Sequence, residues 1–152
     1  MKKYVLSTVL ICISLFSFGQ KLKLNEDGIY VCDSVFNYQD SNLIETLKSR
    51  VLSLNYNIEQ GVNSQIVASR YYSLGALSGQ KVKYRVRIEI KENKYRINFS
   101  NFIIQYPVDN QLKEELLEKI IFRKMWVKNI EKQLPKMIGE LDLNTKKVSK
   151  DW

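Results

Sequence analysis

One long β-hairpin, expected over residues 80–106, constrains the fold of this chain more than any other stretch. Apolar and polar residues alternate on both sides of a short polar segment, which is the period-2 pattern of half-buried strands. A two-residue turn at Glu92-Asn93 places three apolar pairs on one face: Ile90 with Tyr95, Ile88 with Ile97 and Val86 with Phe99. A slip of one residue would break every pair, so the pattern predicts the register as well as the strands.

The opposite face of the hairpin is basic. It carries four cationic side chains, which are Lys83, Arg85, Arg87 and Arg96. Such a row can bind an anionic partner, or it can be the ordinary solvated face of an antiparallel sheet. Glu89 is expected opposite Arg96, which fits the solvated face. These four residues are therefore a speculative binding site, and the solvated face is the simpler interpretation.

The second strand of the hairpin requires a local irregularity. Its later apolar residues, Phe102, Ile104 and Tyr106, are out of phase with the earlier ones. A bulge near Ser100-Asn101 would return them to the same face and bend the strand. Burial on both sides is the alternative interpretation.

A first helix is expected after residue 42, because apolar residues recur with helical spacing at Leu43, Ile44, Leu47, Val51 and Leu54. Asn42 followed by Glu45 matches a capping box, although Asp40 or Ser41 can equally cap this helix.

A second, longer helix is expected from about Gln111 to Gln133, with acidic residues early and basic residues late, as the helix dipole favours. Its apolar stripe consists of Leu112, Leu116, Leu117, Ile120, Ile121, Val127, Ile130 and Leu134. Pro135 ends or kinks this helix, and residues 135–152 are expected to form a frayed tail.

Two further strands are expected from their residue types, at 28–38 and 65–74, and residues 58–61 can add a short edge segment that is not counted among the strands. In the strand at 65–74, Arg70 falls on the apolar face unless a bulge shifts the phase. Together the elements predict an α+β fold, in which an antiparallel twisted sheet of about four strands carries both helices on one face. The expected order is β-α-β-β-β-α. We expect a single domain over 21–152, with its core at about 28–134.

Residues 1–20 have the layout of a signal peptide, with a basic start, an apolar run over Tyr4–Phe18 and small residues after it. The run is too short for a confident membrane span, which needs about 20 apolar residues. We expect export to the periplasm or the cell exterior after cleavage near Gly19 or Gln20, with an uncleaved N-terminal anchor as the alternative. Lipidation of Cys12 is not expected, because Ile11 is too bulky for a lipidation site.

Cleavage would remove two lysines and lower the formal net charge from +8 to +6. A basic exported protein can meet anionic lipid or glycan, but moderate charge also serves solubility. Cys32 would be the one cysteine left, so no intrachain disulfide is expected. It is best interpreted as a small buried hydrophobe, although a bridge between two chains stays open.

The composition argues against most enzyme classes. The chain has no histidine, which removes Ser-His-Asp triads and histidine-containing metal sites. One remaining cysteine excludes an intrachain zinc site built from cysteines, and neither a P-loop nor a GxGxxG motif is present. Paired carboxylates, as used in glycoside hydrolysis, stay available. We therefore expect no catalytic residues, no cofactor and no metal site.

The layout resembles a family of exported bacterial proteins of unknown function with a TBP-like fold, the domain of unknown function 4468. The resemblance covers about 28–134 and is carried by four segments: the signal segment 1–20, GIYVCDSVF at 28–36, KENKYRINFSNF at 91–102 and the long C-terminal helix. It implies a TBP-like sheet and supplies no catalytic residue. DNA binding is not implied, because the face expected to be wet has no apolar wedge to insert between bases.

These observations predict a non-catalytic exported binding or interaction module. Its partner is expected to be an envelope protein, an anionic glycan or a lipid headgroup, and no nucleic acid is expected. Two alternatives stay open, namely a carboxylate-based hydrolase and a structural or oligomerising envelope protein.

Overall fold

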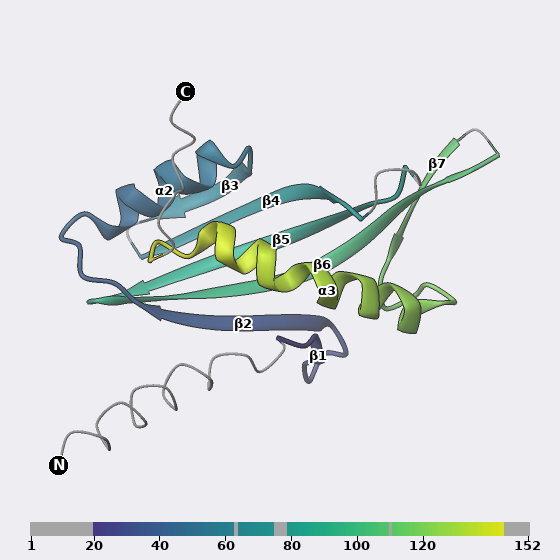
Figure 1. Ribbon diagram of the computed structural model, residues 1–152, viewed down its shortest axis with the longest axis horizontal. Coiled ribbons are helices and arrows are strands. Elements are labelled where there is room, and N and C mark those ends of the chain that lie inside the picture. The colour runs from purple at the N-terminus through teal and green to yellow at the C-terminus, as the bar shows by residue number, and fades with distance from the viewer. Residues whose placement is uncertain (1–19, 63, 75–78, 110, 145–152) are drawn as a thin grey trace, which may run out of the picture.

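The computed structural model describes residues 20–62, 64–74, 79–109 and 111–144, which contain a seven-stranded antiparallel sheet (Figure 1). The strands are β1 (Lys23–Leu24), β2 (Tyr30–Asn37), β3 (Asn57–Val62), β4 (Gln65–Ser73), β5 (Lys81–Lys91), β6 (Lys94–Val108) and β7 (Gln111–Leu116). They lie side by side in the order β1-β2-β6-β5-β4-β3, with β7 paired to β6. The α+β class is confirmed. The prediction of about four strands in the order β-α-β-β-β-α is wrong, because the elements run β-β-α-β-β-β-β-β-α.

The hairpin of β5 and β6 has the predicted register. All three expected apolar pairs are present: Ile90 with Tyr95, Ile88 with Ile97 and Val86 with Phe99. Glu89 lies opposite Arg96, also as predicted. Every member of these apolar pairs except Ile90 is at most 1% exposed, so the inner face of the hairpin forms the floor of the core.

The predicted bulge is present on β6. The pairing partners shift by one residue between Lys83 and Arg85 of β5. On β6, Asn101 adopts a φ of 52°, in the left-handed region that asparagine tolerates better than most residues. Beyond this point Phe102 and Ile104 are fully buried, so the extra residue restores one apolar face to the strand.

Strand β6 has two successive partners along one of its edges. Lys94–Phe99 pairs with β2, and Ile103–Val108 pairs with β7. Strand β5 pairs with β6 along both of these parts and therefore occupies the other edge. The bulge at Asn101 lies where β2 gives way to β7.

Two helices, α2 (Leu43–Ser53) and α3 (Arg123–Leu141), pack with the inner face of the sheet into one core. Figure 1 shows α3 lying across the strands. The inner side of α2 is made by Leu43, Leu47 and Val51, as its helical spacing predicted. Neither described helix combines the length and the apolar character needed to cross a lipid bilayer.

The start of α2 differs from the expected capping box. Asn42 stands at the N-cap position but makes no side-chain capping hydrogen bond, and Glu45 pairs with Lys48 at 2.9 Å. Asp40, one of the alternatives, organises the turn: it accepts hydrogen bonds from the backbone N–H of Asn42 at 2.8 Å and from Thr46 Oγ1 at 2.7 Å. The bond from Asn42, followed by the bond from Thr46, holds the pKa of Asp40 below its usual value.

The prediction of one helix over 111–133 is wrong. Residues 111–116 form β7, and α3 begins only at Arg123. Two residues of the supposed apolar stripe, Leu112 and Leu116, are 65% and 37% exposed. The part of β6 beyond the bulge has a free edge, and a turn through Asp109 (φ 47°) returns the chain onto it. Hydrogen bonding to this edge outweighs the local helix preference of lysine and glutamate.

Helix α3 continues past Pro135 to Leu141, so the predicted frayed tail is wrong for residues 135–141. Met137, Ile138 and Leu141 extend the inner stripe of the helix and are at most 3% exposed. Pro135 is exposed. Burial of the three apolar side chains after it outweighs the missing hydrogen bond to the carbonyl of Glu131. The rest of the expected tail, 145–152, lies outside the described residues.

Arg70 points to the inner face of the sheet, and β4 pairs with β5 in unbroken register, so no bulge is needed. Its Nη1 donates to Glu140 Oε2 of α3 at 2.7 Å, and its guanidinium lies 5.3 Å from the ring centroid of Tyr56. Arg50 of α2 donates from Nε to the backbone oxygen of Glu140 at 2.6 Å. This cluster ties the sheet to both helices.

Candidate binding surface on the outer face of the sheet

An open groove of about 440 Å³ lies over β2, β6 and β5 on the outer face of the sheet. The turn between β1 and β2 contributes to it, with Asn25 Oδ1 accepting a hydrogen bond from the N–H of Ile29 at 2.9 Å and Gly28 at a φ of 73°. The groove is lined by Asn25, Asp27, Ile29, Val31, Asp33, Arg85, Arg87, Glu89, Arg96, Asn98, Ser100 and Asn101. Three of the four residues of the predicted basic row therefore meet in one place.

Two of these arginines are already paired with carboxylates. Arg96 Nε donates to Asp33 Oδ1 of β2 at 3.1 Å, and the same oxygen accepts from Asn98 Nδ2 at 2.9 Å. Arg85 forms an ion pair with Glu59 of β3 at 2.8 Å. The hydrogen bond and the charge of Asp33 raise the pKa of Arg96. Much of the positive charge of the row is thus compensated within the sheet.

Arg87 is the exception. It lies opposite Asn98 on one side and Val67 on the other, between the two paired arginines. Its side chain is exposed, and within the described part of the chain its guanidinium has no ion pair or hydrogen bond. It is therefore the cation of the groove that is free to bind a ligand.

Lys83, the fourth residue of the row, does not line the groove. Its Nζ lies 5.5 Å from the ring centroid of Tyr71 on β4, a cation–π contact at the surface. The structure therefore separates Lys83 from the three arginines, because the groove follows β2 and β6 and does not extend to this end of β5.

The acidic partners were not predicted. Asp33 lies on β2 and Glu59 on β3, and neither strand is next to the hairpin in sequence. Their position depends on the order and register of the strands in the sheet, which alternation within one strand does not reveal. Arg96 and Asp33 pair across the adjacent strands β6 and β2, as is common in antiparallel sheets. Arg85 and Glu59 pair across β4, which lies between β5 and β3.

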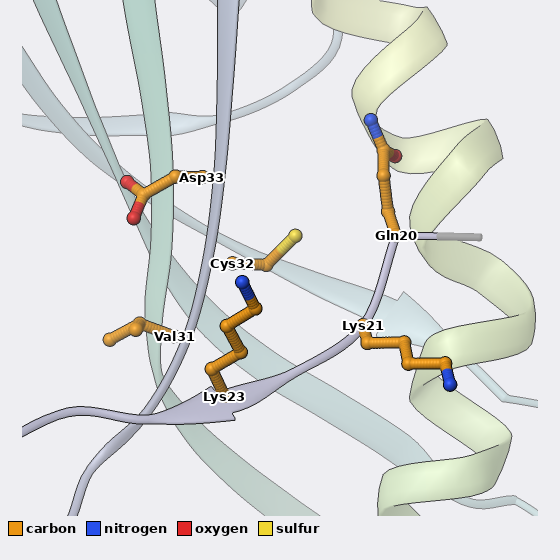
Figure 2. Close-up of a pocket in the computed structure, with 6 residues that line it drawn as sticks. All are labelled: Gln20, Lys21, Lys23, Val31, Cys32 and Asp33. Carbon is orange, nitrogen blue, oxygen red and sulfur yellow. The ribbon is translucent and has the colours of Figure 1, made fainter. Parts of the chain in front are cut away.

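A second hollow, of about 290 Å³, lies beside Cys32 (Figure 2). Figure 2 shows the thiol pointing away from the side chains of Val31 and Asp33, and Cys32 is 4% exposed. Burial, reinforced by the charges of Asp33 and Glu131, raises the pKa of Cys32 to about 11. The thiol stays protonated near neutral pH and is a poor nucleophile. It is a small buried side chain, as the sequence suggested.

The chemistry of the groove is set by its charged side chains. No three histidine, cysteine, aspartate or glutamate side chains among the described residues converge on a metal-sized site. Asp27, Asp33 and Glu89 share the groove with three arginines. Such alternating charges suit a polar ligand that offers an anionic group to Arg87.

Comparison with solved structures shows the fold of the chain. A TBP-like protein from Parabacteroides distasonis ATCC 8503 matches with a TM-score of 0.60 and 15% identity, over 77% of this chain and 92% of that one. A DUF4468 family protein from Bacteroides ovatus ATCC 8483 matches with a TM-score of 0.58 and 13% identity, over 79% and 87% of the two chains. No protein-family model matches the sequence, and no curated protein matches it either. The likeness confirms the TBP-like fold that the resemblance to the domain of unknown function 4468 implied, and at these identities it shows the fold alone.

Proposed function

We propose that the chain is a non-catalytic binding module that uses its outer groove to hold a partner with an exposed anionic group. The observation that supports this most directly is Arg87, a solvent-exposed guanidinium in a concave site with no counter-ion among the described residues. A carboxylate or a similar group can accept two parallel hydrogen bonds from such a side chain.

The neighbours of Arg87 suit a selective contact. Arg85 and Arg96 are held in place by Glu59 and Asp33, so their donors surround Arg87 without much net charge of their own. A partner with one anionic group can place it against Arg87. A uniformly negative surface would also lie against the acidic side chains of the groove, which would repel it. The groove therefore favours an acidic glycan or peptide, where the anionic groups are separated by neutral ones.

Binding is preferred over hydrolysis for a specific reason. Glycoside hydrolysis needs two carboxyl groups that flank one bond, with one of them able to deliver a proton. In the groove, Asp33 is bound to Arg96 and Asn98, and Glu89 lies opposite Arg96. Asp33 is thus held as a structural partner of Arg96 and Asn98, and the charge of Glu89 acts on the same arginine.

The proposal also places the module outside the cytoplasm, because residues 1–20 have the layout of a signal peptide. The expected product is a chain that starts near Lys21. Mass spectrometry of the protein recovered from periplasm and medium tests this, and full-length protein confined to the cytoplasm would refute it.

The groove is tested with Arg87→Glu and a matched control, Lys91→Glu, which reverses an exposed cation outside the groove. The probe is an immobilised acidic glycan, polygalacturonate, with neutral dextran as its uncharged counterpart. A charged hydrogen bond contributes roughly 1.5–3 kcal/mol, so Arg87→Glu should weaken binding at least tenfold, while Lys91→Glu should change it little. If both variants lose the same affinity for polygalacturonate, the effect is one of overall charge and Arg87 has no specific role. If the wild type binds both glycans equally, the ligand of the groove is not anionic.

A further inference from the structure

A second surface, unrelated to the groove, lies at the start of α3 and combines exposed apolar side chains with cations. Ile121 is 87% exposed, Phe122 72% and Met125 52%. Arg123 and Lys124 stand between them in the sequence, and all five line one hollow of about 450 Å³. We call these five residues the α3 tip. Figure 1 shows the start of α3 toward the same end of the molecule as β7.

The α3 tip is held rigidly by its neighbours. Leu117 and Ile120 before it and Trp126 within α3 are buried, at 0%, 8% and 5% exposure. The backbone oxygen of Phe122 accepts hydrogen bonds from the N–H groups of Met125 and Trp126 at 3.0 and 3.4 Å. The apolar side chains therefore point outward from an anchored turn. Because the apolar residues next to them in the sequence are buried, the exposure of Ile121, Phe122 and Met125 is a specific property of this fold.

Positive charge continues from the α3 tip along the outer side of the helix. Lys124, Lys128 and Lys132 recur every four residues and so form one stripe. All three are exposed. Lys136 continues the spacing, but its Nζ lies 5.8 Å from the ring centroid of Tyr72 on β4, so it is not part of this stripe. None of the ion pairs in the described part of the chain involves any of these lysines.

The acidic residues of this segment face elsewhere. From Leu117 to Gly139 the sequence has six basic side chains and two acidic ones. Glu118 accepts a hydrogen bond from the backbone N–H of Tyr30 at 2.9 Å, and Glu131 accepts one from Leu22 at 3.0 Å. Both carboxylates are thus turned toward the N-terminal segment of the fold. The outer side of α3 is left with almost unopposed positive charge.

We propose that the α3 tip and the lysine stripe dock the protein on a lipid surface that contains anionic phospholipids. Ile121, Phe122 and Met125 enter the boundary between headgroups and acyl chains, while the lysines lie over the headgroups. Apolar insertion and cationic attraction are the two contributions that peripheral membrane binding combines. A nucleic acid would match the lysines but leave Ile121 and Met125 without an apolar partner, so the lipid surface matches the whole patch. Because α3 covers the inner face of the sheet, docking leaves the outer groove free.

The test is co-sedimentation with vesicles, using the chain in the form in which cells produce it. One set of vesicles contains phosphatidylcholine alone. The second set is a mixture of phosphatidylcholine and the anionic lipid phosphatidylglycerol. The wild type should bind the anionic vesicles more tightly, and raising the salt from about 0.1 M to about 1 M should weaken binding, because the screening length falls from about 10 Å to about 3 Å. Any segment 1–20 that is retained contributes equally to every variant.

Two variants remove the two halves of the surface. Ile121→Ser with Phe122→Ser removes the apolar part, and should weaken binding at least about tenfold. Serine is also a favourable residue at the N-cap position that Phe122 occupies, so the fold should be kept. The triple variant Lys124→Ala, Lys128→Ala and Lys132→Ala removes the charge. It should weaken binding to anionic vesicles roughly fivefold per lysine, or about 100-fold in all.

Matched controls remove similar groups elsewhere. Leu52→Ser changes an apolar residue of α2 that is 58% exposed. Lys81→Ala, Lys91→Ala and Lys94→Ala together remove three exposed cations from the hairpin. Both controls should bind anionic vesicles within about twofold of the wild type. Circular dichroism and urea unfolding must show that all variants are folded.

Several outcomes would overturn the proposal. Absence of wild-type binding, equal affinity for the two kinds of vesicle, or equal loss in the tip variants and the controls would each do so. A dimer in solution that the Phe122→Ser change dissociates would assign the α3 tip to a second copy of the chain instead. The glycan test of the groove is scored separately, so failure there leaves the vesicle result intact.

Discussion

The Arg70–Glu140 ion pair supports a quantitative prediction about what joins the sheet to α3. Both side chains are 23% exposed, and the Nη1–Oε2 distance is 2.7 Å. Burial works to lower the pKa of Arg70, but the hydrogen bond and the charge of Glu140 outweigh it and leave the pKa raised. Arg70 therefore stays cationic, and removal of Glu140 leaves a partly buried charge beside Tyr56 and Tyr72 without its carboxylate partner.

The magnitude follows from this partial burial. Exposed pairs contribute about 0–1 kcal/mol, and breaking a fully buried pair costs about 3–5 kcal/mol. For Arg70 and Glu140 we expect Glu140→Gln to lower the free energy of unfolding by about 1–2 kcal/mol, and Arg70→Met to lower it by a similar amount while keeping its packing over Tyr56. The double variant should lose little more than either single one, which gives a coupling of about 1–2 kcal/mol.

Urea unfolding, followed by circular dichroism, measures the free energy of unfolding of the wild type, the two single variants and the double variant. With a urea slope of about 1–2 kcal/mol per molar, the single variants should shift the midpoint by about 1 M. Glu45→Gln is the control, because its pair with Lys48 is exposed and should change stability by less than about 0.5 kcal/mol. Additive losses in the double variant would show that Arg70 and Glu140 are not coupled and would refute the reasoning.

Three further predictions concern single positions. At Asn101, whose φ is 52°, glycine should leave the free energy of unfolding unchanged or slightly raised, whereas valine should lower it by about 1–2 kcal/mol; equal effects in urea unfolding would contradict the bulge. Replacement of Pro135 by alanine should restore a donor to the carbonyl of residue 131 and raise the melting temperature, with a gain of up to about 3 kcal/mol; a lower melting temperature would show that the helix needs its proline. The pKa of Cys32 is raised from 9.0 to about 11 in the fold, so the unfolded thiol ionises first, and this contribution to stability is full below pH 9.0 and lost as the pH rises to about 11. Unfolding of the wild type should therefore show a steeper loss of stability over this range than Cys32→Ala, and parallel curves would argue against a protected thiol.

The hairpin was predictable because all of its information is local. Strand periodicity, turn and register lie within one stretch of sequence, and a single slip would expose residues such as Ile88 and Ile97. The bulge followed from the same rule, since Phe102 can reach the core only if one residue is skipped. The outward direction of the arginines was fixed at the same time, which is why three of the four predicted site residues meet in one groove.

The errors arose where the decisive partner is distant or absent from the local pattern. Residues 111–116 are rich in lysine and glutamate, and nothing local indicates that β6 would offer them a free edge. Pro135 predicts the end of a helix, but burial of Met137 and Ile138 stabilises the helix beyond it. In the candidate site, the neutralising carboxylate of Asp33 belongs to a strand that only the tertiary fold brings beside Arg96.

The two-part edge of β6 has a consequence for how the chain folds. Strands β3 to β7 follow one another along the chain, and each pairs with its sequence neighbour. The strands of this meander can pair one after another, because each pairing closes only a short loop and costs little chain entropy. Strand β2 is different, because Cys32 pairs with Phe99 across the helix α2 and three intervening strands. Its docking is the most non-local step, the kind that slows folding. Amide hydrogens of β2 should accordingly exchange before those of the meander, and the bulge at Asn101 marks where the early-forming and late-forming parts of the sheet meet.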